Sequence, residues 1–320
     1  MSTLRSIDRL AAMIRYFLKR LAGAIPTWFV IVTVTFFLIR VAPGGPFDQE
    51  QSLAPEIMAN LQSAYGLDQP MWAQYFRYVS ALAHGDFGPS FKYKDFTVTE
   101  LIGQGLPVTL ELGTLALSLA LALGIPIGTF AALHHNSAAD HVTMSLAVVG
   151  IAIPTFVVLP FLGLFFGIYL HWLPVAGWEP GSSRHLVLPV IALALPPLAY
   201  IARLTRGGML EVLRSHFIRT AIAKGLPLHT MILRHALRPA LVPVAGYLAP
   251  AVASIMTGSL VVESIAGLPG VGRYLVQGAL NRDYTLVMGM VILYSTVLIG
   301  MGLIVDLLYA WLDPRNRFER

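Results

Sequence analysis

The sequence contains no cysteine among its 320 residues, and it has few charged residues. Without cysteine, the chain forms no disulfide and offers no thiolate to a metal. Asp, Glu, Lys and Arg make up 12% of the residues, whereas a soluble domain has roughly 25%. Hydrophobic residues make up 56%, and the mean hydropathy is +0.69. This composition predicts an integral membrane protein.

Motifs for nucleotide and metal chemistry are also missing. The sequence has no G-x-x-x-x-G-K-[ST] run to cradle phosphates and no H-E-x-x-H run to bind zinc. The nine histidines are scattered, and His134-His135 is the only adjacent pair. We therefore expect no catalytic residues, no metal site and no cofactor in this chain. The glycine-rich run Gly267–Gly272 does not match G-x-G-x-x-G, and we interpret it as a turn.

Six apolar runs, each free of Asp, Glu, Lys and Arg, divide the chain. They are Leu21–Ile39, Leu112–Leu133, Val142–Leu170, Leu186–Ala202, Ala240–Val262 and Thr285–Val305. A spanning helix needs about 20 apolar residues, so the pattern predicts an all-α membrane protein with six transmembrane helices. The first run is too long for a signal peptide. Pro154 and Pro160 are expected to kink the third, which is long enough to tilt.

The distribution of basic residues predicts the orientation. With the N-terminus inside and six spans, the inner segments hold fifteen Lys and Arg and the outer segments hold six. Inner loops of membrane proteins are enriched in these residues. We therefore expect both termini in the cytoplasm.

The segment 203–239 is rich in basic residues and lies between the fourth and fifth runs. It has seven Lys and Arg and one acid, Glu211. An apolar residue at every fourth position predicts one face of a helix; these are Met209, Leu213, Phe217 and Ala221.

A break and a second helix are expected to follow. Gly225-Leu226-Pro227 ends the first helix, because glycine suits the left-handed position after a helix and proline cannot continue the turn. Leu228–Leu237 would then form a short helix that Pro239 stops, with Ile232 and Ala236 on one face. The segment is either a docking element for a soluble partner or a solvated loop whose charges only set the topology.

The stretch from Arg219 to Pro239 resembles the loop found in membrane subunits of ABC-type importers. That pattern is Glu-Ala-Ala, three residues, Gly, nine residues, Ile-x-Leu-Pro. Ala221, Gly225 and Leu237 match it. The departures are Arg219 for Glu, Thr220 for Ala, His235 for Ile and a proline one residue late, at Pro239. These departures are similar to the peptide-importing branch of the family.

The resemblance covers essentially the whole chain, and the oligopeptide permeases are the most similar branch. Further motifs that support it are Ala42-Pro43-Gly44, the run from His84 to Phe91, Gly267–Gly272, Asn281-Arg282-Asp283-Tyr284 and Asp313-Pro314-Arg315. The resemblance implies a type I importer permease of the bacterial inner membrane. It also implies a second homologous permease, two ATP-binding subunits that hold ATP and Mg²⁺, and an external peptide-binding protein as partners.

The resemblance also implies which residues act. Those expected to couple the permease to its ATPases are Phe217, Arg219, Thr220, Ala221, Lys224, Gly225, Leu226, Pro227 and Leu237. Three acids at the ends of predicted spans, Glu111, Glu263 and Asp306, are candidates for the substrate path. A charge in hydrocarbon is unfavourable and usually faces protein or water, so each is alternatively an interfacial residue.

The polar segment 43–104 follows the first span. We predict a short helix from Ser52 to about Gly66. A second helix, Met71–His84, is expected to carry Trp72, Tyr75, Phe76 and Val79 on one face. This face either packs on the chain's own spans or contacts the binding protein or the mouth of the substrate path. We divide the sequence into 1–104, with the first span and the outer segment, and 105–320, the core permease domain.

Three alternatives stay open. A dipeptide or nickel permease of the same family has similar motifs. An ion-coupled secondary transporter would instead need an ionisable relay at mid-span and inverted repeats, and the charge-free runs disfavour it. A membrane protein that only anchors partners would not need so many prolines within its spans.

Overall fold

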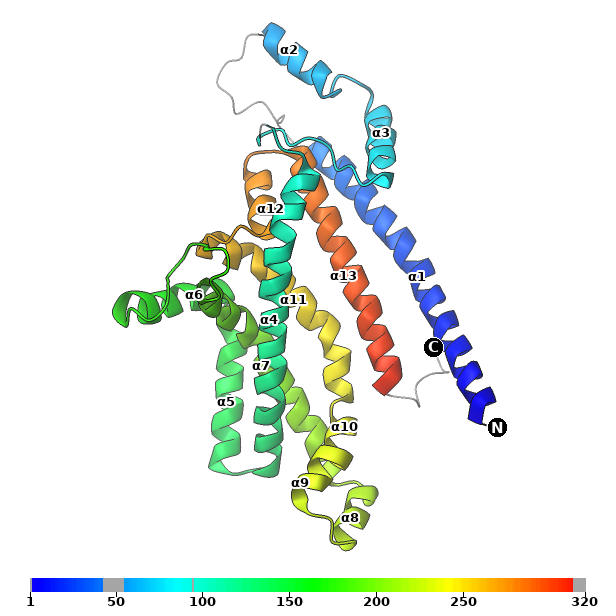
Figure 1. The fold of residues 1–320 in the computed structure, drawn as a ribbon, viewed down its shortest axis with the longest axis vertical. Helices are drawn as coiled ribbons and strands as arrows, with labels where there is room; N and C mark the ends of the chain where they lie inside the picture. The colour runs from blue at the N-terminus through cyan, green and yellow to red at the C-terminus, as the bar shows by residue number, and fades with distance from the viewer. Residues whose placement is uncertain (1, 43–54, 94, 313–320) are drawn as a thin grey trace. The chain divides into compact units, whose positions relative to one another are not determined.

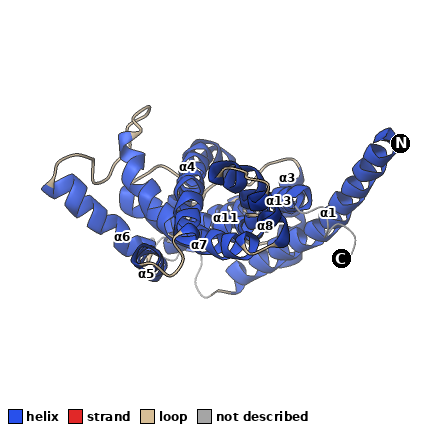
Figure 2. Ribbon diagram, turned by 90° about the horizontal axis from the view of Figure 1, so that it is seen from below, coloured by secondary structure: helices blue, strands red, loops and turns tan. Residues whose placement is uncertain are grey.

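The computed structural model describes residues 2–42, 55–93 and 95–312, and its regular elements are helices (Figure 1). Within these ranges, β pairing is limited to one isolated bridge between Pro89 and Thr97, and Figure 2 shows no strand. The longest helices are α1 (Ser2–Val41), α4 (Val98–Leu133), α7 (Arg184–Leu213), α11 (Val242–Ala266) and α13 (Tyr284–Leu312). The shorter ones are α2 (Pro55–Ala64), α3 (Met71–Ala83), α5 (Ala138–Ala152), α6 (Thr155–Leu162), the π-helix η1 (Gly163–Tyr169), α8 (His216–Ala223), α9 (Leu228–Thr230), the π-helix η2 (Met231–Ala236), α10 (Leu237–Ala240) and α12 (Val271–Leu280).

Five helical segments in the described part are long and apolar enough to cross a membrane. They are Leu18–Val41, Val98–Leu133, Arg184–Leu213, Val242–Ala266 and Tyr284–Leu307. Each contains all or most of one predicted apolar run, so the all-α, multi-span fold class is confirmed. A sixth span exists if α5 together with α6 and η1 crosses the membrane as one bent element.

The third apolar run is not a single kinked helix. α5 and the helical segment that starts at Thr155 meet at 104°. Ile153 is extended (ψ 120°) because the ring of Pro154 disfavours helical geometry at the residue before it. Pro160, by contrast, lies inside α6. The expectation of one long tilted span is thus corrected to two helices with a sharp turn at Pro154.

The chain forms two compact units. Unit 1 comprises Met1–Ala24, Glu111–Gly267 and Leu298–Arg320, and unit 2 comprises Ile25–Leu110 and Leu268–Val297. These units are defined by packing, and the division of the sequence between 104 and 105 stays a prediction.

Glycines let the helices of unit 1 approach closely. A Cβ at Gly124 would lie 2.9 Å from the carbonyl oxygen of Leu198, and one at Gly128 would lie 2.3 Å from that of Ala202. The backbones of α4 and α7 therefore touch along one turn, as small residues at this spacing allow in membrane helices. α7 also packs along α5 and α11.

Unit 2 has its own apolar cluster. Val32 and Phe36 of α1, Tyr78 of α3, and Met288 and Ile292 of α13 are buried together. This confirms that α3 packs on the chain's own spans. The predicted face of α3 is partly wrong, because Trp72 and Phe76 are exposed while Gln74 and Tyr78 are buried.

A buried aspartate organises the other part of unit 2. Asp283 is fully buried just before α13, and its carboxylate accepts hydrogen bonds from the backbone N–H groups of Phe91 (3.0 Å) and Leu286 (3.0 Å) and from the hydroxyl of Ser90. It therefore joins the loop after α3 to the start of α13.

Some predicted features lie outside the described residues. These are Pro43 and Gly44 of the first motif, Ser52 at the predicted start of α2, and the motif Asp313-Pro314-Arg315.

Candidate functional site

The basic segment after α7 folds as a helix, a break and a second helix, all within unit 1 (Figure 1). α7 ends at Leu213, and Ser215 is extended (ψ 155°) before α8 begins. This interruption shifts the helical phase, so Ile218 is fully buried whereas Phe217 is 49% exposed. The predicted continuous stripe through Phe217 is therefore wrong. Ala221, which was assigned to the same stripe, is buried as expected.

Gly225 adopts the left-handed backbone that the sequence suggested, with φ +72°. Its N–H donates to the carbonyl oxygen of Ile222 (2.9 Å), and that of Leu226 donates to the carbonyl oxygen of Ala221 (3.3 Å), which closes the end of α8. A Cβ at Gly225 would meet no atom within 4 Å. The glycine is required there by its backbone conformation rather than by lack of space. Pro227 follows as the N-cap of α9.

The second helix of the loop contains a π-helical turn. α9, η2 and α10 run without interruption from Leu228 to Ala240. Pro239 lies inside α10 instead of stopping the helix before it. Because this proline lacks an N–H, the last turn of the helix, which ends at Ala240, has one backbone donor fewer.

The buried face of the loop packs on the ends of α4 and α7. Ile218, Met231, Ala236 and Ala240 form one cluster with Ala132 of α4 and Met209 of α7, and Ile232 and Leu237 pack against it. A Cβ at Gly208 would lie 2.3 Å from the carbonyl oxygen of Ala240. The loop is therefore a stiff element fixed to two long helices, and not a free linker.

The opposite face of the loop is exposed. It combines apolar and basic groups from α8 and the break, and its members include Phe217, Arg219, Thr220, Ile222, Lys224, Leu226 and Pro227. Of the residues predicted to couple the permease to an ATPase, Ala221 and Leu237 thus face inward, and the others are accessible to a partner.

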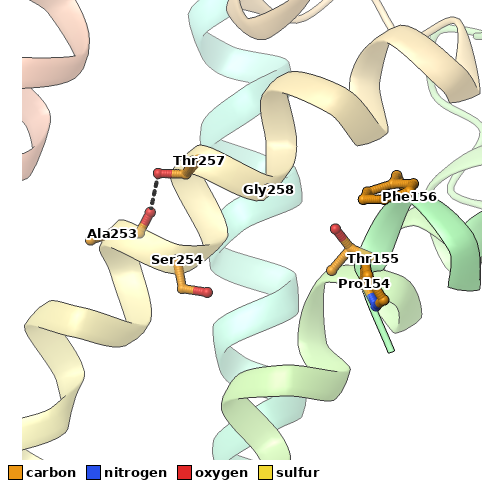
Figure 3. Close-up of a pocket in the computed structure, with 7 residues that line it drawn as sticks. All are labelled: Pro154, Thr155, Phe156, Ala253, Ser254, Thr257 and Gly258. Carbon is orange, nitrogen blue, oxygen red and sulfur yellow. Dashed lines mark hydrogen bonds between the residues drawn. The ribbon is translucent and has the colours of Figure 1, made fainter. Parts of the chain in front are cut away.

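A hollow of about 530 Å³ lies between the turn at Pro154 and the middle of α11. Figure 3 shows the hydroxyl groups of Thr155 and Ser254 on its facing walls, and Thr257 donates to the carbonyl oxygen of Ala253 (2.9 Å). Its lining is uncharged and consists of Pro154, Thr155, Phe156, Ala253, Ser254, Thr257 and Gly258. Sequence reasoning proposed none of these residues for a substrate path and singled out Pro154 only as a kink, although hydroxyls beside a proline or glycine within apolar runs were a visible signal.

The three acids proposed for the substrate path do not line this hollow. Glu111 is exposed on α4, and Glu263 is fully buried on α11. Asp306 of α13 pairs with Arg20 of α1 at 3.0 Å. Their roles in the path stay predictions. In residues 2–42, 55–93 and 95–312, no three His, Asp or Glu side chains form a group suited to a metal ion.

Several spanning helices, a loop after α7 with one buried face, and a hollow beside the middle of α11 indicate a membrane transport subunit. Comparison with known families agrees. Residues 124–318 match the binding-protein-dependent transport system inner membrane component, and residues 13–113 match the N-terminal component of such systems. The chain belongs to this family of ABC importer permeases, which decides against the ion-coupled secondary transporter.

Peptide permeases are among its relatives, and the predicted resemblance to the oligopeptide permeases is confirmed. The chain is 52% identical over 306 residues to the oligopeptide transport system permease protein OppB of Escherichia coli (strain K12), covering 96% of this chain and 100% of the relative. It is 44% identical over 308 residues to the dipeptide transport system permease protein DppB of Bacillus subtilis (strain 168), covering 96% and 99%.

A solved structure shares the fold. The MetNI methionine ABC transporter, in an inward-facing conformation, aligns with a TM-score of 0.56 and 15% identity, over 67% of this chain and 96% of that chain. At this identity the likeness extends to the fold alone.

Proposed function

We propose that this chain is the membrane-spanning subunit of an ABC importer that moves oligopeptides across the bacterial inner membrane. The observation that supports the substrate most is the 52% identity to OppB, which extends over 96% of this chain. ATP hydrolysis in partner subunits supplies the energy, and both termini lie in the cytoplasm.

The coupling segment, defined here as residues 214–241, supports the link to an ATPase. Its inner face is fixed by Ile218 and Met231, while its outer face offers Phe217, Arg219 and Lys224 to a partner. A rigid element with one buried and one open face can transmit a rigid-body motion, whereas a limp linker cannot. The predicted coupling residues are therefore retained in this proposal.

The complete transporter has four further components. A second homologous permease completes the path, two ATP-binding subunits hold Mg²⁺ and ATP beneath the coupling segments, and an external binding protein delivers the peptide. ATP binding closes the ATPase pair, the coupling segments carry that movement to the spans, and the path opens outward to receive peptide. Hydrolysis then resets the cycle.

The hollow at Pro154 suits a path that accepts many peptides. Hydroxyls of Thr155 and Ser254 can bond to backbone donors and acceptors, which every peptide has, and uncharged walls do not select a side-chain charge. Glu111, Glu263 and Asp306 stay candidates for further polar contacts along the path.

Two substrates remain as alternatives within the family. A dipeptide permease is supported by the 44% identity to DppB, and a nickel permease rests on family analogy alone. The deciding experiment reconstitutes the complete complex in proteoliposomes with its binding protein and ATP. We expect uptake of labelled penta- and hexapeptides. Uptake of dipeptides without uptake of longer peptides would favour the dipeptide permease. Uptake of Ni²⁺ without uptake of peptides would favour the nickel permease.

A further inference from the structure

Asp140, in the first turn of α5, forms a bidentate ion pair with Arg206 of α7. The distances are 2.6 Å from Nε of Arg206 to Oδ1 and 2.6 Å from Nη2 to Oδ2. The side chain of Asp140 is 2% exposed and that of Arg206 is 25% exposed. A paired arginine–carboxylate contact fixes the relative orientation of two elements as well as their distance.

The turn between α4 and α5 is built around the same carboxylate. The backbone N–H of Asn136 donates to Oδ2 of Asp140 (3.0 Å), and the hydroxyl of Ser137 accepts from the N–H of Asp140 (3.3 Å) as the cap of α5. Nδ1 of His135 lies 3.5 Å from the same oxygen. Asn136 is left-handed, with φ +62°. The pair with Arg206 therefore holds the whole turn against α7.

Arg206 lies on α7, about two helical turns before the coupling segment begins at residue 214. Three residues further, Met209 is part of the cluster that buries Ile218 of α8. Ala132, at the end of α4, belongs to the same cluster. Figure 1 shows the α4–α5 turn at the same end of unit 1 as α8 and α9. A displacement of the coupling segment therefore acts first on α7, which carries Arg206, and on α4, which leads into the turn that Asp140 organises.

The far end of α5 leads into one wall of the hollow. α5 ends at Ala152, and Pro154, Thr155 and Phe156 line the hollow immediately after it. From Asp140 to Ala152 a helix rises about 18 Å, at 1.5 Å per residue. One helix thus joins the ion pair to the hollow.

We propose that Asp140 and Arg206 are positioning residues that transmit the movement of the coupling segment through α5 to the wall at Thr155. This inference rests on the proposed function. A buried ion pair is often no more stabilising than apolar residues of the same volume, and fixing geometry is its best-attested use. Without the pair, the packing of α5 against α7 is not fixed in orientation, and packed helices can slide along one another.

The test uses the absence of cysteine in this chain. Thr155→Cys is placed in the complete complex in nanodiscs, and the maleimide reaction rate of this subunit is measured without nucleotide and in the ATP–vanadate state. We expect a rate difference of about tenfold between the two states. With Asp140→Asn added, we expect less than a twofold difference and loss of peptide-stimulated ATP hydrolysis, while basal hydrolysis and co-purification of the ATPases continue.

A second variant separates positioning from stability. Arg206→Lys keeps the positive charge beside Asp140 but cannot bond both oxygens in a fixed plane. We expect it to lose the nucleotide-dependent rate difference with a normal yield of complex. Glu100→Gln is the matched control, because Glu100 bonds Thr97 at the exposed start of α4, and it should behave as the parent.

The outcomes distinguish the two proposals. A full rate difference in Asp140→Asn or Arg206→Lys would overturn the role of the pair. Peptide uptake by the parent complex without any rate difference at Thr155→Cys would overturn this inference alone, because the wall would not move. Absence of peptide uptake by the parent complex would instead overturn the proposed function.

Discussion

Asp283 and Phe91 are 192 residues apart in the sequence, yet the carboxylate of the first accepts a 3.0 Å hydrogen bond from the backbone N–H of the second. The same oxygen accepts from Ser90 and Lys92, and the other accepts from Leu286. Because the carboxylate is fully buried, these donors have no water to replace it.

Replacing this carboxylate should loosen the loop 84–97. In Asp283→Asn, an NH₂ group faces donors, so several bonds are lost or reversed. Leaving buried donors unpaired costs about 1–3 kcal/mol each, and we expect a lower melting temperature of the purified complex and faster proteolysis within 84–97. Asp68→Asn is the control, because the side chain of Asp68 is exposed and its carboxylate accepts a hydrogen bond from the hydroxyl of the nearby Ser63. Equal proteolysis of both variants would contradict the role of Asp283.

Gly225 gives a test of the coupling segment. A β-branched residue at φ +72° adds about 1–3 kcal/mol of local strain. This strain is small compared with the free energy that burial of the spanning helices supplies. It is large for a docking element, whose geometry must fit its partner. We expect Gly225→Val to reach the membrane at normal levels and to lose peptide uptake. Gly225→Asn should retain uptake, since asparagine tolerates the left-handed region. Full uptake by Gly225→Val would remove the segment from its proposed role.

The purified chain alone should not hydrolyse ATP. The sequence lacks a phosphate-binding loop of the G-x-x-x-x-G-K-[ST] type, whose backbone N–H groups would hold the nucleotide. Phosphate release should equal the background of a mock purification and should rise only when the ATPase subunits are added. Hydrolysis by a preparation shown by mass spectrometry to lack those subunits would contradict this.

The six-span topology predicts opposite labelling at two exposed positions. Single cysteines replace Ser63 in α2 and His134 in the α4–α5 turn, both of which are exposed. In intact spheroplasts, an impermeant maleimide should label Ser63→Cys and should reach His134→Cys only after lysis. If both label without lysis, the spans cannot be arranged as proposed.

The sequence predicted the elements whose signals are local. Charge-free runs predicted the spanning helices, and Gly225-Leu226-Pro227 predicted the break because glycine and proline determine their own backbone. The turn at Pro154 was expected as a kink, but its 104° angle depends on how α6 packs against α7 and α11, and a single proline does not specify that.

Phase and long-range pairing were not predictable in the same way. Phe217 fits the four-residue spacing, yet the extended backbone at Ser215 turns Ile218 inward in its place. The pairing of Asp140 with Arg206 joins residues 66 apart. Nothing in either local sequence distinguishes such a pair from two interfacial charges, because tertiary contacts alone bring them together.

The division of unit 2 into two separate stretches of sequence bears on how the protein is made. Most of unit 1 is the continuous stretch Glu111–Gly267, so its helices can assemble while the ribosome is still adding later residues. Ser90 and Phe91, in contrast, leave the ribosome long before Asp283 is synthesised. Domains generally fold as units during synthesis. The packing of this loop against Asp283 must therefore wait until the start of α13 has been synthesised.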